Sequence, residues 1–135
     1  PGAPMAMGWA VMRHLGVEGY LRLTDATLQA ADRIRDAVAA LDGIRVLGGG
    51  RFHLVAIAGD PDAAGGPIDV FALGDALLAK GWFHDRQTPP DSLHATVSNS
   101  NVAVIDDYLA ALEQSVREVR GERTDDRSTN YATLE

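Results

Sequence analysis

The chain has 135 residues, a formal net charge of −7, four histidines and no cysteine. This length suits one domain, the acidic balance argues against a nucleic-acid partner, and the lack of cysteine excludes disulfides, thiolate metal sites and thiol catalysis. No apolar run approaches the roughly 20 residues that span a bilayer. We therefore expect no membrane partner and a cytoplasmic location. The chain opens with Pro1-Gly2 and no initiator methionine, so we also expect a segment before residue 1.

The first 41 residues predict two helices separated by Gly16. Met5, Trp9 and Met12 form one stripe in a helix over residues 4–15. A second helix follows over residues 17–41, and it ends before Gly43. Its buried face is predicted from apolar steps of three and four residues: Tyr20, Leu23, Thr27, Ala31, Ile34, Val38 and Leu41.

The periodicity then changes to that of strands. Residues 44–47 predict a short strand, and residues 52–58 predict a central strand that is covered on both faces, because the run is almost continuously apolar. Asp69 is a good cap for a helix over residues 70–80, with Gly81 as its end. Its inward residues are predicted to be Val70, Leu73 and Leu77.

The last third predicts two more strands and one long helix. The strands are expected at residues 82–85 and 93–97, with a turn at residues 87–91 between them. Asn101 is the expected cap of a helix over residues 102–120, whose apolar stripe includes Leu109 and Leu112. Residues 121–135 are polar and are expected to fray.

The predicted order is therefore ααββαββα. Tight strand-to-strand connections imply hairpins, so we expect an α+β domain in two layers, with a largely antiparallel sheet and helices mainly on one face.

Few motifs in the chain indicate chemistry. The segment Gly48-Gly49-Gly50-Arg51-Phe52 is rich in glycine, but a phosphate-binding loop leads into a helix, and here a strand follows. A hairpin turn is therefore favoured over an anion site. Lys80 is the only lysine; at a helix end beside glycine it indicates a partner for the helix dipole rather than a Schiff-base amine.

The four histidines, His14, His53, His84 and His94, lie on four different predicted elements, which argues against a metal site. Ser92 and His94 share one face of a strand, but no third orienting group accompanies them, so a hydrolase site is weakly supported.

Four stretches of the chain carry a resemblance to a known family. They are PGAPMAMGWAVMRHLGVEGYLRL, LDGIRVLGGG, IDVFALGDALLAKGWFHDRQTPPDSLHATVS and the helix that follows. Through them, residues 1–120 resemble the C-terminal small domain of pyridoxal-phosphate-dependent lyases of the group II decarboxylase type, and in particular bacterial members similar to sphingosine-phosphate lyase.

The resemblance implies that residues 1–16 are a connecting helix from an absent N-terminal large domain, and that residues 121–135 are a tail. It also implies pyridoxal 5'-phosphate as the cofactor of a parent enzyme that is a homodimer. The Schiff-base lysine of that family lies in the large domain, so we expect no catalytic residue, no bound cofactor and no activity in this chain alone.

In such enzymes the small domain closes over the active-site cleft. The resemblance places residues 83–87 and 92–98 nearest that cleft, and makes His94, Arg86 and Gln87 candidates for contact with substrate. Leu93, Ala95 and Val97 are expected to face the helices, which leaves His94 and Thr96 on the opposite face. For His94, an ordinary half-exposed position in the sheet is the competing interpretation. The competing function is a stand-alone α+β regulatory or protein-interaction module without catalysis. The resemblance further predicts that Met5, Trp9 and Met12, which would face the large domain, lead to self-association or to disorder of residues 4–15.

Overall fold

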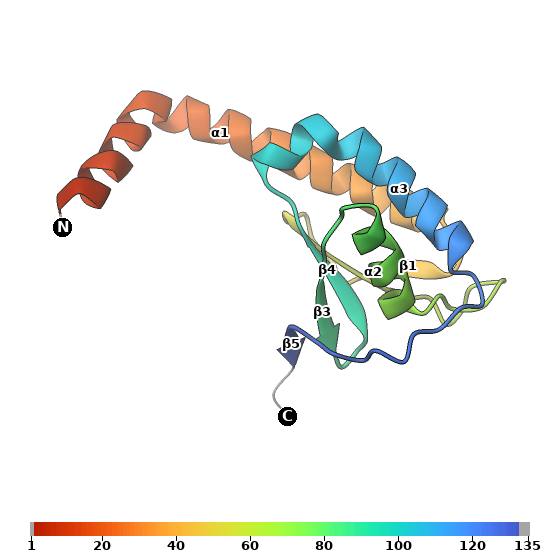
Figure 1. Cartoon of the computed structure of the whole chain (residues 1–135). Helices are drawn as coiled ribbons and strands as arrows, with labels where there is room; N and C mark the ends of the chain where they lie inside the picture. The colour runs from red at the N-terminus through yellow and green to blue at the C-terminus, as the bar shows by residue number, and fades with distance from the viewer. Residues whose placement is uncertain (1, 133–135) are drawn as a thin grey trace.

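The computed structural model describes residues 2–132, in which three long helices and five strands form one α+β unit (Figure 1). In chain order the elements are α1 (Gly2–Ala40), β1 (Ile44–Leu47), β2 (Leu54–Gly59), α2 (Val70–Ala79), β3 (Asp85–Thr88), β4 (Ser92–Thr96), the 3-10 helix η1 (Asn99–Val104), α3 (Ile105–Glu118) and β5 (Tyr131–Ala132).

The strands form a single sheet in the order β1-β2-β4-β3-β5. The first four are antiparallel to their neighbours, and β5 runs parallel to β3. The predicted α+β class and the largely antiparallel sheet are confirmed. β2 is an inner strand as expected, but the middle of the sheet is β4, which pairs with both β2 and β3.

One face of the sheet carries the core. Val55 and Ile57 of β2 and Leu93 of β4 are fully buried on this face, where α1, α2 and α3 pack. Leu54 and Ala56 alternate onto the other face, where Leu54 is exposed. No helix of the described chain covers this second face, so the prediction that the strand is covered on both faces is wrong at Leu54, whereas Ala58, further along the same face, is buried.

The helices contribute most of the predicted core. Ile34 and Val38 of α1, Leu73 and Leu77 of α2, and Leu112 of α3 are buried as expected. Leu109 is only half-buried, and Tyr108 beside it is buried in its place. Both positions fit the helical repeat, so periodicity alone does not distinguish them.

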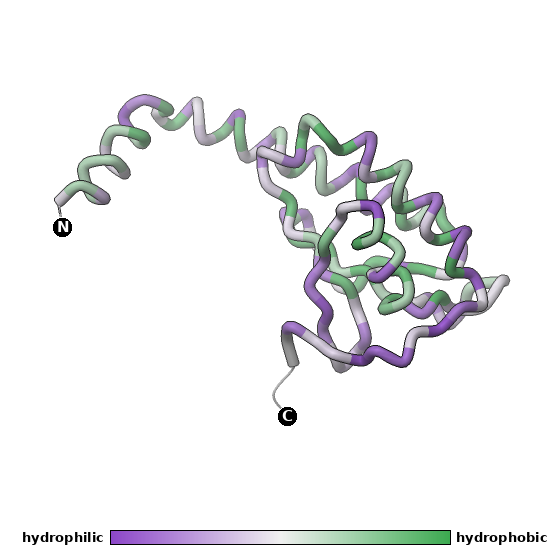
Figure 2. The backbone as a smooth tube through the Cα atoms, in the orientation of Figure 1, coloured by the Kyte–Doolittle hydropathy of each residue, from purple (hydrophilic) through white to green (hydrophobic). Residues whose placement is uncertain are grey.

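α1 is two helical segments joined by a kink. Gly16 has φ 59° and ψ −177°, a backbone conformation available almost only to glycine, and the predicted break at this residue is confirmed. Residues 2–15 form an arm that projects away from the rest of the domain, which is here called the body. Hydropathy colouring shows that the arm is largely apolar (Figure 2). Met5, Trp9 and Met12 are exposed there.

The predicted buried stripe of the second helix is correct only in its second half. Ala31 and Ile34 are buried, but Tyr20 and Leu23 are exposed. The sheet and α3 lie beside the end of α1 that is nearer Ala40, so the preceding turns have no packing partner in the described chain.

Several boundaries differ from the prediction, among them the start of β2, which is Leu54 rather than Phe52. β3 begins at Asp85 rather than Trp82, and it extends to Thr88, which falls within the predicted turn. The predicted helix at residues 102–120 begins as the 3-10 helix η1, and Ser98 rather than Asn101 is the capping residue. Asn101 instead accepts a hydrogen bond from the Ser98 backbone N–H at 2.7 Å. Asp69 caps α2 as predicted, because its carboxylate accepts a hydrogen bond from the Phe71 N–H at 3.0 Å.

The C-terminal segment is ordered against the domain through residue 132. It runs from the end of α3 along the N-terminal end of α2 and finishes as β5 on the edge of β3 (Figure 1). Its polar groups have partners on α2 and β3, and the expectation that the tail frays stays a prediction.

Candidate functional site

The candidates for substrate contact lie on β3 and β4, and they do not share one face. His94 pairs in register with Ala56 of β2 and with Asp85 of β3, and Gln87 pairs with Ser92. Because side chains alternate along a strand, His94 and Gln87 are on the face that no helix covers, and Arg86 between its neighbours is on the helix face. The structure brings His94 and Gln87 onto one surface and separates Arg86 from them.

His94 is half-buried, and Thr96, two residues further on the same face, is exposed. Leu93, Ala95 and Val97 are buried on the opposite face. This confirms the predicted orientation of the 93–97 strand.

A groove of about 520 Å³ reaches the edge of this open face. It is lined by the turn Gly48–Gly50, by Phe52 and Leu54 at the start of β2, by His94, and by Arg35 of α1. Arg35 donates hydrogen bonds to the carbonyl oxygens of Phe52 and, at 3.1 Å, of Leu54. The glycine-rich segment connects β1 to β2, so the hairpin interpretation is confirmed.

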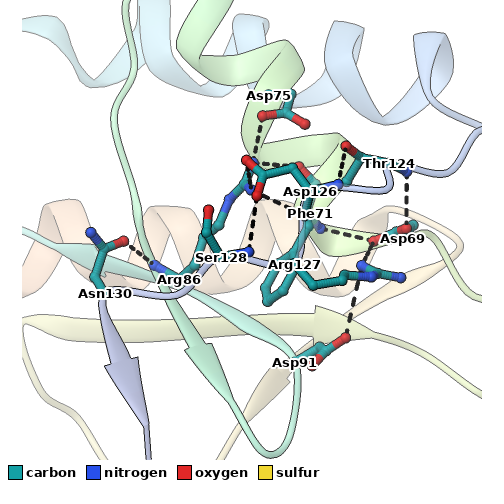
Figure 3. Close-up of polar contacts among 10 residues, drawn as sticks. All are labelled: Asp69, Phe71, Asp75, Arg86, Asp91, Thr124, Asp126, Arg127, Ser128 and Asn130. Atoms are coloured by element: carbon teal, nitrogen blue, oxygen red, sulfur yellow. Dashed lines mark hydrogen bonds and ion pairs between the residues drawn. The ribbon is translucent and has the colours of Figure 1, made fainter.

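Arg86 is held on the helix face by partners from two segments, α2 and the C-terminal segment (Figure 3). Its Nη2 donates to the Asp75 carboxylate at 2.5 Å and to the Phe71 carbonyl oxygen at 3.1 Å. Its Nη1 donates to the carbonyl and carboxylate oxygens of Asp126, both at 3.3 Å. The side chain is only 12% exposed. The guanidinium of this candidate residue therefore has carboxylate and carbonyl partners within the chain.

A second arginine meets the N-terminal end of α2. Arg127 Nη1 lies 2.8 Å from Asp69 Oδ1 and 3.9 Å from Asp91 Oδ2. Burial alone would raise the pKa of Asp69, but hydrogen bonds from Arg127 and from the N–H groups of Phe71 and Thr124 outweigh it and hold this pKa below its usual value. The carboxylate therefore stays charged and ties residues 124–127 to α2.

Sequence reasoning missed a buried polar pair beside the core. The His84 Nε2 atom and the Tyr108 hydroxyl lie 2.9 Å apart, and His84 is 8% exposed. Burial lowers the pKa of His84 and raises the pKa of Tyr108, because desolvation disfavours the charged form of each. The signal that could have found the pair is the position of Tyr108, three residues after Ile105 and four before Leu112.

The remaining candidates show no catalytic arrangement. The Ser92 hydroxyl is buried and donates to the Pro90 carbonyl oxygen at 3.1 Å, so its proton is directed away from a base. Lys80 forms an ion pair with Glu118 at the ends of α2 and α3. Within residues 2–132, no group of three or more His, Cys, Asp or Glu side chains is arranged to hold a metal ion, and no helix is long and apolar enough to cross a bilayer.

Comparison with known proteins supports the resemblance. No family model matches the chain. Over 120 residues the chain is 31% identical to a sphingosine-1-phosphate lyase of Arabidopsis thaliana, a match that covers 89% of this chain and 21% of that protein.

Two solved structures share the fold. A sphingosine-1-phosphate lyase of Burkholderia pseudomallei superposes with a TM-score of 0.74 at 30% identity, covering 84% of this chain and 24% of that one. A glutamate decarboxylase of Lactobacillus brevis superposes with a TM-score of 0.73 at 17% identity, covering 86% and 28%, and this likeness shows the fold alone.

The fold and these matches define the class that the chain resembles: it is similar to the C-terminal part of pyridoxal-phosphate-dependent lyases, and it shares only its fold with the decarboxylase. Within that class its sequence is similar to the sphingosine-1-phosphate lyases, of which it spans about a fifth of the length.

Proposed function

We propose that this chain is the small C-terminal domain of a pyridoxal-phosphate-dependent carbon–carbon lyase or decarboxylase similar to sphingosine-phosphate lyase, and that it closes the active-site cleft of that enzyme. The observation that carries the proposal is the similarity along 89% of the chain to only 21% of a sphingosine-1-phosphate lyase. A domain of this kind supplies one wall of a site whose other walls belong to the remaining four-fifths.

The open face of the sheet supports this role. Antiparallel sheets commonly leave one face to water, and that face is then polar. Here Leu54 and Ala56 share it with His94 and Gln87, so the surface mixes apolar and hydrogen-bonding groups as a cleft wall does. His94 and Gln87 are our candidates for contact with substrate. Arg86 lies on the other face of the sheet, where Asp75, Phe71 and Asp126 bind its guanidinium, so we do not include it in this wall.

The arm supports the same role. A helix that is apolar on most of its circumference is normally buried, yet Met5, Trp9 and Met12 are exposed in residues 2–15, as are Met7 and Val11. We propose that the absent large domain covers these side chains, and that the parent enzyme is a cytoplasmic homodimer.

We propose that residues 2–132 do not hold the cofactor by themselves. Pyridoxal 5'-phosphate forms a Schiff base with a lysine amine, and the only lysine of this chain is Lys80, whose amine is engaged with Glu118. We therefore assign the cofactor to the large domain of the parent enzyme, and we expect the 135-residue chain alone to be inactive.

The reading frame that encodes residue 1 tests the proposal. Expression of the whole frame should give a protein that absorbs light as a pyridoxal-phosphate enzyme does and forms a borohydride-reducible lysine adduct. The 135-residue chain should form no stoichiometric adduct at Lys80 under the same conditions. A frame without a lysine-bearing domain before residue 1 would contradict the proposal and leave the stand-alone interaction module.

The site assignment has its own test in the whole protein. His94→Ala should lower lyase activity, and His53→Ala is the matched control because His53 is an exposed histidine outside the strands. Equal activities of the two variants would mean that His94 is an ordinary residue of the sheet, with the class of enzyme unaffected.

A further inference from the structure

The segment from residue 122 to residue 132, here called the strap, is attached to the domain by contacts far away in sequence. Its partners are residues 69–91, at the N-terminal end of α2 and along the edge of β3 (Figure 3). Without the strap, β3 would be an outer strand of the sheet, because its only other partner is β4. The strap therefore occupies a place that an extended polypeptide can take.

Backbone hydrogen bonds set the position of the strap on this edge. The Asn130 N–H donates to the Arg86 carbonyl oxygen at 2.9 Å, and the Arg86 N–H donates to the Asn130 side-chain oxygen at 2.9 Å. The parallel pairing of β5 with β3 continues from there. This is strand addition of the kind by which sheet edges capture peptides, made here within one chain.

Two neighbouring residues of the strap supply the charges that hold it. Asp126 accepts hydrogen bonds from Arg86 of β3, and Arg127 forms an ion pair with Asp69 at the cap of α2. The guanidinium carbons of Arg86 and Arg127 lie 5.1 and 5.2 Å from the centre of the Phe71 ring, so both cations cover the same aromatic side chain (Figure 3). The acidic Asp126 thus faces a basic partner, and the basic Arg127 faces an acidic one.

The strap has no apolar anchor between residues 122 and 130, whose sequence is ERTDDRSTN. Elements of the core, such as α3 with Leu112 and Val116, are held by buried apolar side chains. A segment that depends on exposed polar contacts opens at a lower free energy than the core does. Release of the strap would then leave β1, β2, β4 and the helices in place.

We propose that the edge of β3, together with Asp69 and Phe71, is a binding site for an extended polar segment with an Asp-Arg pair, and that the chain fills this site with its own strap, which opens as a unit separate from the core. The occupant is the strap of the same molecule. The inference depends on the contacts of residues 69–132 and is independent of the proposed catalytic role.

Hydrogen exchange of the full 135-residue chain, read by mass spectrometry, tests the proposal through two matched pairs of substitutions. Asp126→Asn removes the charge that faces Arg86, and Asp125→Asn removes a charge that makes no hydrogen bond or ion pair within the described residues. Arg127→Gln removes the partner of Asp69, and Arg123→Gln removes an arginine that forms no ion pair in residues 2–132.

Amides of residues 124–132 should exchange about tenfold faster in Asp126→Asn and in Arg127→Gln, as expected for the loss of a hydrogen bond to a charged group. Both controls should stay within about twofold of the parent chain by the same reasoning, because they break no such bond. Amides of β2 and β4 should be unchanged in all four variants. A high salt concentration should reproduce the effect in the parent chain, since it screens exposed ion pairs.

Three results would overturn the proposal. Acceleration of β2 and α3 together with the strap would show that the strap is part of the core. Equal effects of Asp125→Asn and Asp126→Asn would show that the contact with Arg86 does not hold it. Protection of residues 124–132 that rises with protein concentration would show that the strap comes from a second copy.

Discussion

The two halves of α1 have similar apolar content and opposite surroundings. In the second half, Ile34 is 3% exposed between the sheet and α3; in the first half, Trp9 is 63% exposed on the arm. The comparison shows that an apolar helical stripe predicts which side chains favour burial. Whether this chain buries them depends on which other elements pack against the helix. Within residues 2–132, apolar partners bury the second half near Ile34, and none buries Trp9 on the arm.

The largest expected effect on stability comes from a substitution in the core of the body. Leu112 is 0% exposed, so Leu112→Ala should lower the free energy of unfolding by about 2 to 5 kcal/mol through lost burial and the remaining cavity. Urea denaturation followed by circular dichroism measures the loss. Leu109→Ala should cost less, because Leu109 is half-buried, and an equal loss at both positions would mean that α3 is rotated from its observed face.

The next largest effect is expected from a substitution at Gly16, in the kink that separates the two halves of α1. Alanine at residue 16 would strain the backbone by about 1 to 3 kcal/mol, and the chain can avoid this cost by straightening α1. Gly16→Ala should therefore change the direction of the arm while the body remains folded.

Spin labels on cysteines introduced at Met5 and Glu113 would report the distance across the kink, and the natural chain has no cysteine to interfere. Gly8→Ala is the control, because a Cβ atom at residue 8 meets no atom within 4 Å and the glycine has no positive φ. An unchanged distance distribution in Gly16→Ala would show that tertiary contacts, and not glycine, set the direction of the arm.

Acid should weaken the body selectively through His84. The pKa of His84 lies below its ordinary value of 6.5 in the folded chain because burial disfavours the imidazolium. Between the folded pKa and 6.5 the unfolded chain binds more protons than the folded chain, so stability rises with pH in this window and is lost as the pH falls below 6.5.

The urea midpoint should be lower at pH 5 than at pH 7.5 in the natural chain. In His84→Phe, whose side chain at residue 84 cannot titrate, the difference between the two midpoints should be smaller. His53→Phe, at an exposed histidine, should keep the full separation. A separation that is the same in both variants would assign the acid sensitivity to other groups.

The smallest effect is expected on the arm. Trp9→Ala should change the free energy of unfolding of the monomer by less than about 1 kcal/mol, because Trp9 is exposed and its contact with the Arg13 guanidinium, 6.0 Å from the ring centre, is a surface cation–π interaction. Acrylamide should quench Trp9 strongly and Trp82 weakly, because Trp82 packs against Tyr108 with ring centres 5.2 Å apart.

Self-association through Met5, Trp9 and Met12 would sharpen the contrast, because apolar patches of this kind bind partners. Sedimentation at increasing concentration should show it, and Trp9→Ala should reduce it. A strict monomer in which Trp9 is protected from quencher would mean that the arm folds back on the body and needs no other chain.

Elements defined by local signals were predictable. Asp69 and Gly81 bound α2 because a cap and a glycine end act within one helical turn, and the alternation of residues 93–97 placed His94 away from the helices. β3 was misplaced because Trp82 and His84 look like strand residues, yet they pack near Tyr108. The polar residues 85–88 owe their extended form to pairing with β4.

The candidate site was predictable only in part for the same reason. Strand alternation places His94 on the open face, but its separation from Arg86 follows from the position of β3, which sequence reasoning shifted. The polar segment 122–130 has no periodicity to indicate order, and its partners on α2, β3 and the turn after β3 lie 36 to 58 residues away along the chain.

The amino-acid sequence by itself determined the helices, the break at Gly16 and the orientation of β4, because each depends on neighbours within a turn or on alternation along one strand. Only the tertiary structure decided that Tyr20 and Leu23 are exposed, that β3 begins at Asp85 and that the strap is ordered. Burial and strand pairing depend on segments that are distant in the chain. The apolar pattern of the sequence predicts which residues favour burial, and the tertiary structure determines which of them are packed and against what.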